Sequence, residues 1–335
     1  MTTFDDLPRV TLAHVPTPLE ALGSLREQFG GPRVWIKRDD CTGLAGGGNK
    51  TRKLEYLIAE AEAEGAQAVV TFGALQSNHA RQTAAACARR GLACDLILAP
   101  AVARTADDYE RSGNLLLDDL LGARLHRLSP GQKAQAMLED VLAQHAAAGR
   151  RAYVIPTGGS NATGALGYVR AAREIAAQCR DRGIYPAAVI HATSTGGTQS
   201  GLLAGFRLEG LSTRVIGINV YTPNSADLAT RIEALTAEVL ARLAPGMAPA
   251  PLGVEVVDGF LGDGYGVPTE AMAAAVRVLA SGEAVLLDPV YSGKAMAGLL
   301  AMLERQAFVE DDDLIFLHTG GAQALSVYTS AFAGG

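Results

Sequence analysis

The stretch Ala187-Ala188-Val189-Ile190-His191-Ala192-Thr193-Ser194-Thr195-Gly196-Gly197-Thr198 joins two local patterns. Its first half is a run of apolar and β-branched residues, which predicts a buried strand. Its second half is a turn of glycines and hydroxyl residues, after which Leu202 and Leu203 continue in a predicted helix. A strand that leads through a Gly-rich turn into a helix is typical of α/β proteins.

The same rhythm recurs along the chain. Further predicted strands span residues 68–71, 95–98, 152–155, 215–220 and 314–318. Because longer segments of helical period lie between them, we predict an α/β fold with a mainly parallel sheet. Gly-rich segments recur at residues 43–49, 157–161, 193–200 and 319–322, the last three after predicted strands. In open α/β sheets ligands bind beyond the carboxyl ends of the strands, so we expect these segments to meet at one site.

Composition narrows the class of protein. The chain has 335 residues, 48% of them hydrophobic, which suffices for about two domains. Its net charge of −6, without a long basic run, argues against nucleic acid or an anionic membrane as partner and favours small molecules. No apolar run is long enough to span a membrane, and the first ten residues do not resemble a secretory signal. The four cysteines form no Cys-x-x-Cys pair and predict reduced thiols in the cytoplasm.

The segment Gly46-Gly47-Gly48-Asn49-Lys50-Thr51 presents a lysine on a Gly-rich turn. A phosphate-binding P-loop requires glycine directly before its lysine, and Asn49 stands there instead. A lysine in this setting can form a Schiff base and then move a proton. Apolar residues at Leu54 and Ile58 predict a helix that starts near Lys50, so the alternative is a solvated cation at a helix start. Lys53 and Lys294 are rivals by residue type alone.

Two strand-to-helix junctions are candidate anion sites. The turn Thr195-Gly196-Gly197-Thr198 offers backbone N–H groups and hydroxyls to a phosphate, unless it is a plain turn of small residues. Gln76-Ser77-Asn78-His79 offers the same kind of site to a substrate carboxylate, although His79 could be only a structural residue. The six histidines have no metal-ligand spacing, so we expect no metal, and a Gly-x-Ser-x-Gly motif is absent.

Six motifs, in chain order, resemble those of the family of aminocyclopropane-carboxylate deaminase and D-cysteine desulfhydrase. They are Lys37-Arg38-Asp39-Asp40, Gly47 to Lys50 with Arg52 to Glu55, Gln76 to His79, Gly264-Tyr265-Gly266, Asp288 to Tyr291, and His318 to Gly321. The resemblance implies pyridoxal 5'-phosphate as the cofactor. It also implies the tryptophan-synthase-β-like (fold type II) fold, an α/β fold with two open twisted parallel-sheet domains and the cofactor between them. The large domain would comprise residues 1–50 and 163–335, and the small inserted domain residues 51–162.

The resemblance assigns roles to individual residues. Lys50, after Asn49, looks like the lysine that binds the cofactor, and Asn78 like the partner of the pyridoxal 3-oxygen. Thr195, Gly196, Gly197 and Thr198 look like the phosphate loop, Thr319 like the residue at the pyridine nitrogen, and Tyr291 like the aromatic side chain against the cofactor ring. The remaining predicted substrate ligands are Gln76, Ser77, His79, Tyr265 and Ser292, of which Ser77 looks like a carboxylate ligand. Lys50, Ser77, Tyr265 and Tyr291 are the predicted catalytic residues.

Two positions separate the reactions of the family. The deaminases carry glutamate directly after the tyrosine that matches Tyr291, and leucine at the position of Thr319; this chain has Ser292 and Thr319. A hydroxyl near the pyridine nitrogen favours elimination of a good leaving group over ring opening, because it strengthens the electron sink less than a carboxylate does. We therefore predict β-elimination from a small amino acid to pyruvate and ammonia, first from D-cysteine.

Alternatives remain open at this point. L-Cysteate, with sulfite as the leaving group, is a close competitor, because residues 39–43, 49–52 and 191–193 also resemble the cysteate sulfo-lyases of the family. Aminocyclopropane-carboxylate deamination and a non-catalytic ligand-binding relative rank lower. The family resemblance also implies a homodimer.

Overall fold

The computed structural model describes residues 4–104, 106–247 and 251–333. Within these residues the strands form two separate sheets, one of six strands and one of four. Strands of the larger sheet are β1 (Leu19–Ala21), β2 (Arg33–Arg38), β7 (Pro186–Thr193), β8 (Arg214–Asn219), β9 (Glu255–Val257) and β10 (Asp313–His318). Strands of the smaller sheet are β3 (Ala68–Ala74), β4 (Ala93–Ala99), β5 (Arg124–Arg127) and β6 (Ala152–Ile155).

Both sheets are parallel apart from one edge. The larger sheet has the order β1-β2-β10-β7-β8-β9, in which only the pair β1 and β2 is antiparallel. The smaller sheet has the order β5-β4-β3-β6, and all its pairs are parallel. The predicted α/β class with mainly parallel pairing is therefore confirmed.

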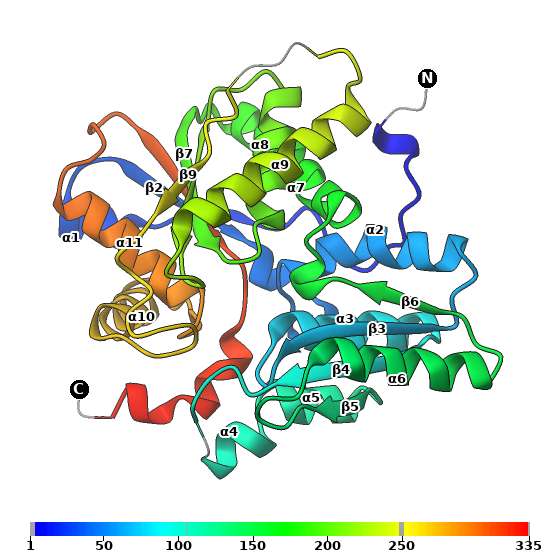
Figure 1. The fold of residues 1–335 in the computed structure, drawn as a ribbon. Coiled ribbons are helices and arrows are strands. Elements are labelled where there is room, and N and C mark those ends of the chain that lie inside the picture. Colours follow the sequence, from blue (N-terminus) through cyan, green and yellow to red (C-terminus); the bar gives the residue numbers. More distant parts are fainter. Residues whose placement is uncertain (1–3, 105, 248–250, 334–335) are drawn as a thin grey trace.

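Helices cover both faces of each sheet, as parallel sheets require (Figure 1). Against the larger sheet pack α1 (Gly23–Phe29), α7 (Ala162–Arg182), α8 (Gly197–Leu208), α9 (Ser225–Leu243), α10 (Glu270–Glu283) and α11 (Ser292–Glu304). Helices of the smaller sheet are α2 (Lys50–Ala63), α3 (Asn78–Arg90), α4 (Asp107–Arg111), α5 (Asn114–Leu120) and α6 (Ala134–Ala147). No helix in the described part of the chain is long and apolar enough to cross a membrane.

Helix α2 begins at Lys50 and is held by a buried ion cluster. Arg52 donates from Nη2 to Asp39 Oδ1 at 2.8 Å and from Nη1 to Glu174 Oε2 at 2.9 Å. Lys37 Nζ lies 2.5 Å from Glu174 Oε1, and all but Glu174 are at most 2% exposed. Since Lys37 lies on β2 and Glu174 on α7, these contacts fix the start of α2 against the larger sheet.

Candidate active site

A cavity of about 600 Å³ lies where the carboxyl ends of the two sheets face each other. Residues that follow β3, β4 and β6 line one part of it, and residues that follow β7, β8 and β10 line the rest. This is where ligands bind in open α/β sheets. The expectation that the Gly-rich loops meet at one site is therefore confirmed for the segments after β6, β7 and β10.

Lys50 enters this cavity from the first turn of α2. Burial lowers the pKa of its ammonium to about 8, an effect that a hydrogen bond with Lys53 opposes. The preceding residue, Asn49, donates its backbone N–H to Thr319 O at 3.0 Å and its Nδ2 to Thr198 Oγ1 at 3.1 Å. The residue before Lys50 is therefore held between the loop after β10 and the start of α8.

The N-terminus of α8 is open to the cavity. Its N-cap is Gly196, at φ +90°, which has no side chain to cap the helix, and Ser160 Oγ accepts from Gly197 N at 3.2 Å. Thr195, Gly196 and Thr198 line the cavity, and Thr195 Oγ1 lies 2.6 Å from Ser160 Oγ. The N–H groups that stay free at a helix N-terminus attract an anion, and the helix dipole adds to this attraction.

Lys53 adds a second amine to this side of the cavity. Its Nζ donates to Gly158 O at 3.1 Å and to Ser160 Oγ at 3.3 Å. Burial, reinforced by the charge of Lys50, lowers its pKa well below the ordinary value. A side chain at Gly197 would come within 2.7 Å of Ser160 Oγ and 3.0 Å of Lys53 Nζ, so glycine is needed there.

The N-terminus of α3 lies at another wall. Ser77 is its N-cap and accepts from Ala80 N at 3.1 Å, which leaves the hydroxyl hydrogen free to donate to a ligand. Asn78 also lines the cavity, as does His79, whose Nε2 lies 2.8 Å from Thr71 Oγ1. Burial lowers the pKa of His79 well below its ordinary value, so the imidazole is neutral.

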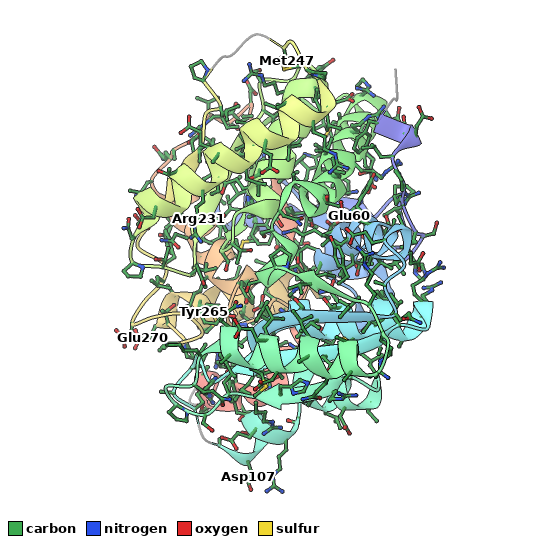
Figure 2. All side chains as sticks on the ribbon, turned by 45° about the vertical axis from the view of Figure 1, so that its right-hand side comes forward. Glu60, Asp107, Arg231, Met247, Tyr265 and Glu270 are labelled. Carbon is green, nitrogen blue, oxygen red and sulfur yellow. The ribbon has the colours of Figure 1, made fainter. Side chains whose placement is uncertain are left out.

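Three tyrosines, Tyr221, Tyr265 and Tyr291, line a further side of the cavity. The hydroxyls of Tyr265 and Tyr291 are hydrogen-bonded, and Tyr221 meets Tyr265 edge to face with ring centroids 5.7 Å apart. Burial raises the pKa of Tyr265 and Tyr291 well above the ordinary value, so both phenols keep their protons. Figure 2 places Tyr265 between the upper and lower parts of the molecule. Lys294 does not line the cavity; its Nζ donates to Leu261 O and Gly264 O in the loop that carries Tyr265.

Three predicted residues do not line the cavity: Gln76, Gly197 and Ser292. Gln76 Nε2 donates to Tyr109 O at 2.6 Å, and its Oε1 accepts from Asn114 N at 2.8 Å. Ser292 Oγ donates to Asp288 Oδ1 at 2.6 Å and accepts from Asp288 N at 2.8 Å. The interpretation of Gln76 and Ser292 as substrate ligands is thus not supported by their positions, because both side chains are engaged in holding local backbone.

The cavity also contains residues that the sequence did not single out. Tyr221, Thr222 and Pro223 follow β8, and Phe72 and Ile97 come from the ends of β3 and β4. Their common signal was position directly after, or at the end of, a predicted strand. Residue type gave no indication for the apolar ones.

The charge of the cavity suits an anionic ligand. Among the described residues that line it, two are lysines and none is aspartate or glutamate. Together with the open N-terminus of α8 and the free donors of Ser77 and Asn78, this donor set fits pyridoxal phosphate, which carries a phosphate and a 3-oxygen anion. In the described part of the chain, no group of three or more His, Cys, Asp or Glu could hold a metal ion.

Comparison with known proteins agrees with this geometry. A model of the family described as "Pyridoxal-phosphate dependent enzyme" matches residues 10–320. D-Cysteine desulfhydrase from Salmonella newport (strain SL254) is 42% identical over 321 residues, 96% of each chain. The crystal structure of an ACC deaminase homologue superposes with a TM-score of 0.86 and 33% identity, covering 98% of this chain and 96% of that one.

A more distant structure supports the fold alone. A hydrogen sulfide-producing enzyme from Fusobacterium nucleatum is 18% identical, with a TM-score of 0.62 over 96% of each chain. Together with the two sheets and the cavity between them, these matches confirm the predicted tryptophan-synthase-β-like (fold type II) architecture. The chain belongs to the family of pyridoxal-phosphate-dependent enzymes.

Proposed function

We propose that this protein is a carbon–sulfur lyase that converts D-cysteine and water to pyruvate, ammonia and hydrogen sulfide. The observation that carries the proposal is the half-buried Lys50 amine, whose pKa is lowered to about 8, in a cavity whose described lining contains no acid. An amine with a pKa near the working pH can accept the α-proton of an amino acid and return it later. The 42% identity with D-cysteine desulfhydrase supports this choice of substrate.

The other cavity residues receive binding roles. Ser77 and the first N–H groups of α3 bind the substrate carboxylate, and Tyr265 faces the substrate. Thr195, Gly196 and Thr198 hold the phosphate, Asn78 donates to the 3-oxygen, and Thr319 faces the pyridine nitrogen. Tyr291 packs against the ring. When bound, pyridoxal phosphate supplies the electron sink for carbanion chemistry.

L-Cysteate with sulfite release is the second candidate. Hydroxyl groups of Thr157, Ser194 and Thr222 line the cavity, and a sulfonate needs several such donors around its three oxygens. Aminocyclopropane-carboxylate deamination ranks third, because this chain has Ser292 and Thr319 where the deaminases carry glutamate and leucine.

A substrate panel tests the proposal. The holoenzyme is incubated with each enantiomer of cysteine, cysteate, serine and β-chloroalanine, and with aminocyclopropane carboxylate, while pyruvate, sulfide, sulfite and 2-oxobutyrate are assayed. We expect pyruvate and sulfide from D-cysteine at the highest kcat/KM. Sulfite from L-cysteate at a higher kcat/KM would favour the second candidate, and absence of pyruvate from every substrate would exclude elimination.

We further infer that the protein acts in the cytoplasm as a homodimer with two domains. Three of its free cysteines, Cys87, Cys94 and Cys179, are buried and Cys41 is exposed, which suits a reducing compartment. All strands of the smaller sheet fall within the proposed small domain, 51–162. The terminal residues 1–3 and 334–335 of the proposed large domain lie outside the described residues. Sedimentation equilibrium of the holoenzyme tests the dimer.

A further inference from the structure

Asn114, the first residue of α5, lies outside the cavity lining and is fully buried. Its Nδ2 donates to Gln76 O and to Asn78 Oδ1, both at 2.9 Å. Its Oδ1 accepts from Arg81 Nε at 3.2 Å. The amide of Asn114 thus connects an arginine on α3 with a side chain that reaches the cavity.

Donor and acceptor types allow one orientation of this amide. Arg81 can only donate, so it must face the oxygen of Asn114. Its Nη1 donates to Ala45 O at 2.7 Å and to Gly47 O at 2.8 Å, and its Nη2 donates to Gln323 Oε1 at 3.2 Å. The nitrogen of Asn114 then faces Gln76 O, an obligatory acceptor, and therefore also faces Asn78.

The same donor and acceptor types fix the orientation of the Asn78 amide. Since Asn114 offers a donor, Asn78 must turn its oxygen toward Asn114 and its nitrogen the other way. No partner is found for Asn78 Nδ2 among residues 4–104, 106–247 and 251–333, and Asn78 lines the cavity. The cavity consequently receives an N–H donor from Asn78.

We propose that Asn114 is a positioning residue that fixes the amide of Asn78 with its N–H toward the 3-oxygen of pyridoxal phosphate. This inference rests on the proposed role of Asn78 toward that oxygen. The proposal also explains the position of Gln76. The Gln76 side chain accepts from Asn114 N and donates to Tyr109 O and Ser112 O, and these hydrogen bonds hold the start of α5. A side chain at Gly113, at φ +61°, would come within 2.5 Å of Gln76 Oε1, so glycine permits this approach.

Asn114→Asp is the decisive substitution. One carboxylate oxygen still accepts from Arg81, but the other meets the oxygens of Gln76 and Asn78, and the Asn78 amide relieves this repulsion by turning over. Its oxygen then faces the 3-oxygen. The matched control is Asp119→Asn, an exposed position on the same helix.

Two measurements without substrate report on the 3-oxygen. The first is the dissociation constant of pyridoxal phosphate for the apoprotein. The second is the ratio of visible to near-ultraviolet absorbance of the bound cofactor, because a donor to the 3-oxygen stabilises the anionic form that absorbs in the visible. For Asn114→Asp we expect about tenfold weaker binding and about a tenfold lower ratio, since hydrogen bonds to charged groups are the strong ones. Asp119→Asn should change neither.

A double-mutant cycle separates positioning from a structural role. In an Asn78→Ala background, Asn114→Asp should change binding and the absorbance ratio less than about twofold. An equal effect in both backgrounds, or no effect in the wild-type background, would overturn the proposal. Should Asn114→Asp fail to fold, Asn114→Ala, which frees the Asn78 amide, should still lower the ratio about threefold. Since no turnover is measured, failure of the proposed reaction leaves these results readable.

Discussion

Two faces of helix α2 carry basic side chains in opposite settings. Lys50 and Lys53, three residues apart, face the cavity, whose described lining contains no acid, and burial lowers the pKa of both. Arg52, between them in sequence, faces the ion cluster with Asp39 and Glu174, and those acids raise its pKa against the effect of burial. Desolvation without an acid partner therefore yields labile protons on one face, and paired acids keep a permanent charge on the other.

The pKa of an acid in the ion cluster is likewise set by its partners. Burial alone would raise the pKa of Asp39, but the adjacent Arg52 guanidinium outweighs it and the pKa is lowered. Tyr168 also donates to Asp39 Oδ2 at 2.5 Å. The difference between the two faces teaches that partners, and not burial, decide whether a buried cation is a structural group or a chemical one.

Removing Lys50 should have the largest effect. Lys50→Ala deletes the proposed base, which typically contributes 10²–10⁴-fold, together with the amine that binds the cofactor, so we expect kcat/KM for D-cysteine to fall by about 10⁴-fold. Steady-state sulfide release measures it. Arg90→Ala, an exposed ion pair with Glu62, serves as control and should change activity less than about twofold. Activity of Lys50→Ala near that of wild type would contradict the assignment.

Breaking the ion cluster should cost stability. Arg52→Met leaves Asp39 and Glu174 buried without their main partner, so the free energy of unfolding should fall by about 3–5 kcal/mol. Lys53→Met removes a buried cation that has no acid partner among the described residues and should leave the free energy of unfolding unchanged or slightly higher. Urea unfolding of both apoprotein variants makes the comparison. Equal losses would show that the two faces do not differ.

Stability of the apoprotein should rise with pH through Lys50. Its pKa is about 8 in the folded state against an ordinary 10.5, so between these values the unfolded state binds more protons. The free energy of unfolding then increases with pH from about 8 toward 10, by at most about 3 kcal/mol from this group. Lys50→Met should lose this part of the slope in urea unfolding at pH 7.5, 8.5 and 9.5. Parallel slopes for the two proteins would refute a depressed Lys50 pKa.

Removing the hydroxyl of Ser77, a neutral hydrogen-bond donor in the same cavity, should have the smallest effect on activity. Ser77→Ala removes the hydroxyl proposed for the substrate carboxylate and the N-cap of α3. We expect KM for D-cysteine to rise about tenfold with a smaller change in kcat, and the free energy of unfolding to fall by about 1 kcal/mol. Ser77→Thr, which keeps a hydroxyl, should recover most of the loss in KM; failure to recover would point to packing alone.

The elements with local signals were predictable from sequence. Residues 152–155 form β6 as predicted, and the predicted strand-to-helix junction at Ser77 is the N-cap of α3. Strand β2 was missed because Arg33-Val34-Trp35-Ile36-Lys37-Arg38 carries three cations, and its buried Lys37 is compensated by Glu174, 137 residues away. Strands β1 and β9 have only three residues each and leave too little pattern.

Part of the candidate site could also be predicted from the sequence, and part could not. Glycine turns and helix starts placed Lys50, Ser77, Asn78, Thr195 and Thr319 at one cavity. Gln76 stands beside Ser77 in sequence, yet its side chain is bound by Asn114, 38 residues away. Ser292 is bound by Asp288, four residues earlier, where an acid just before a helix start was a readable signal for a cap.

Locating the covalent attachment of pyridoxal phosphate tests the central claim most directly. The holoenzyme is reduced with borohydride, digested, and the modified peptide is sequenced by mass spectrometry. We predict that the cofactor is found on Lys50, the amine at the start of α2 whose pKa burial lowers to about 8. Attachment to Lys53 or Lys294, or absence of any modified lysine, would contradict it.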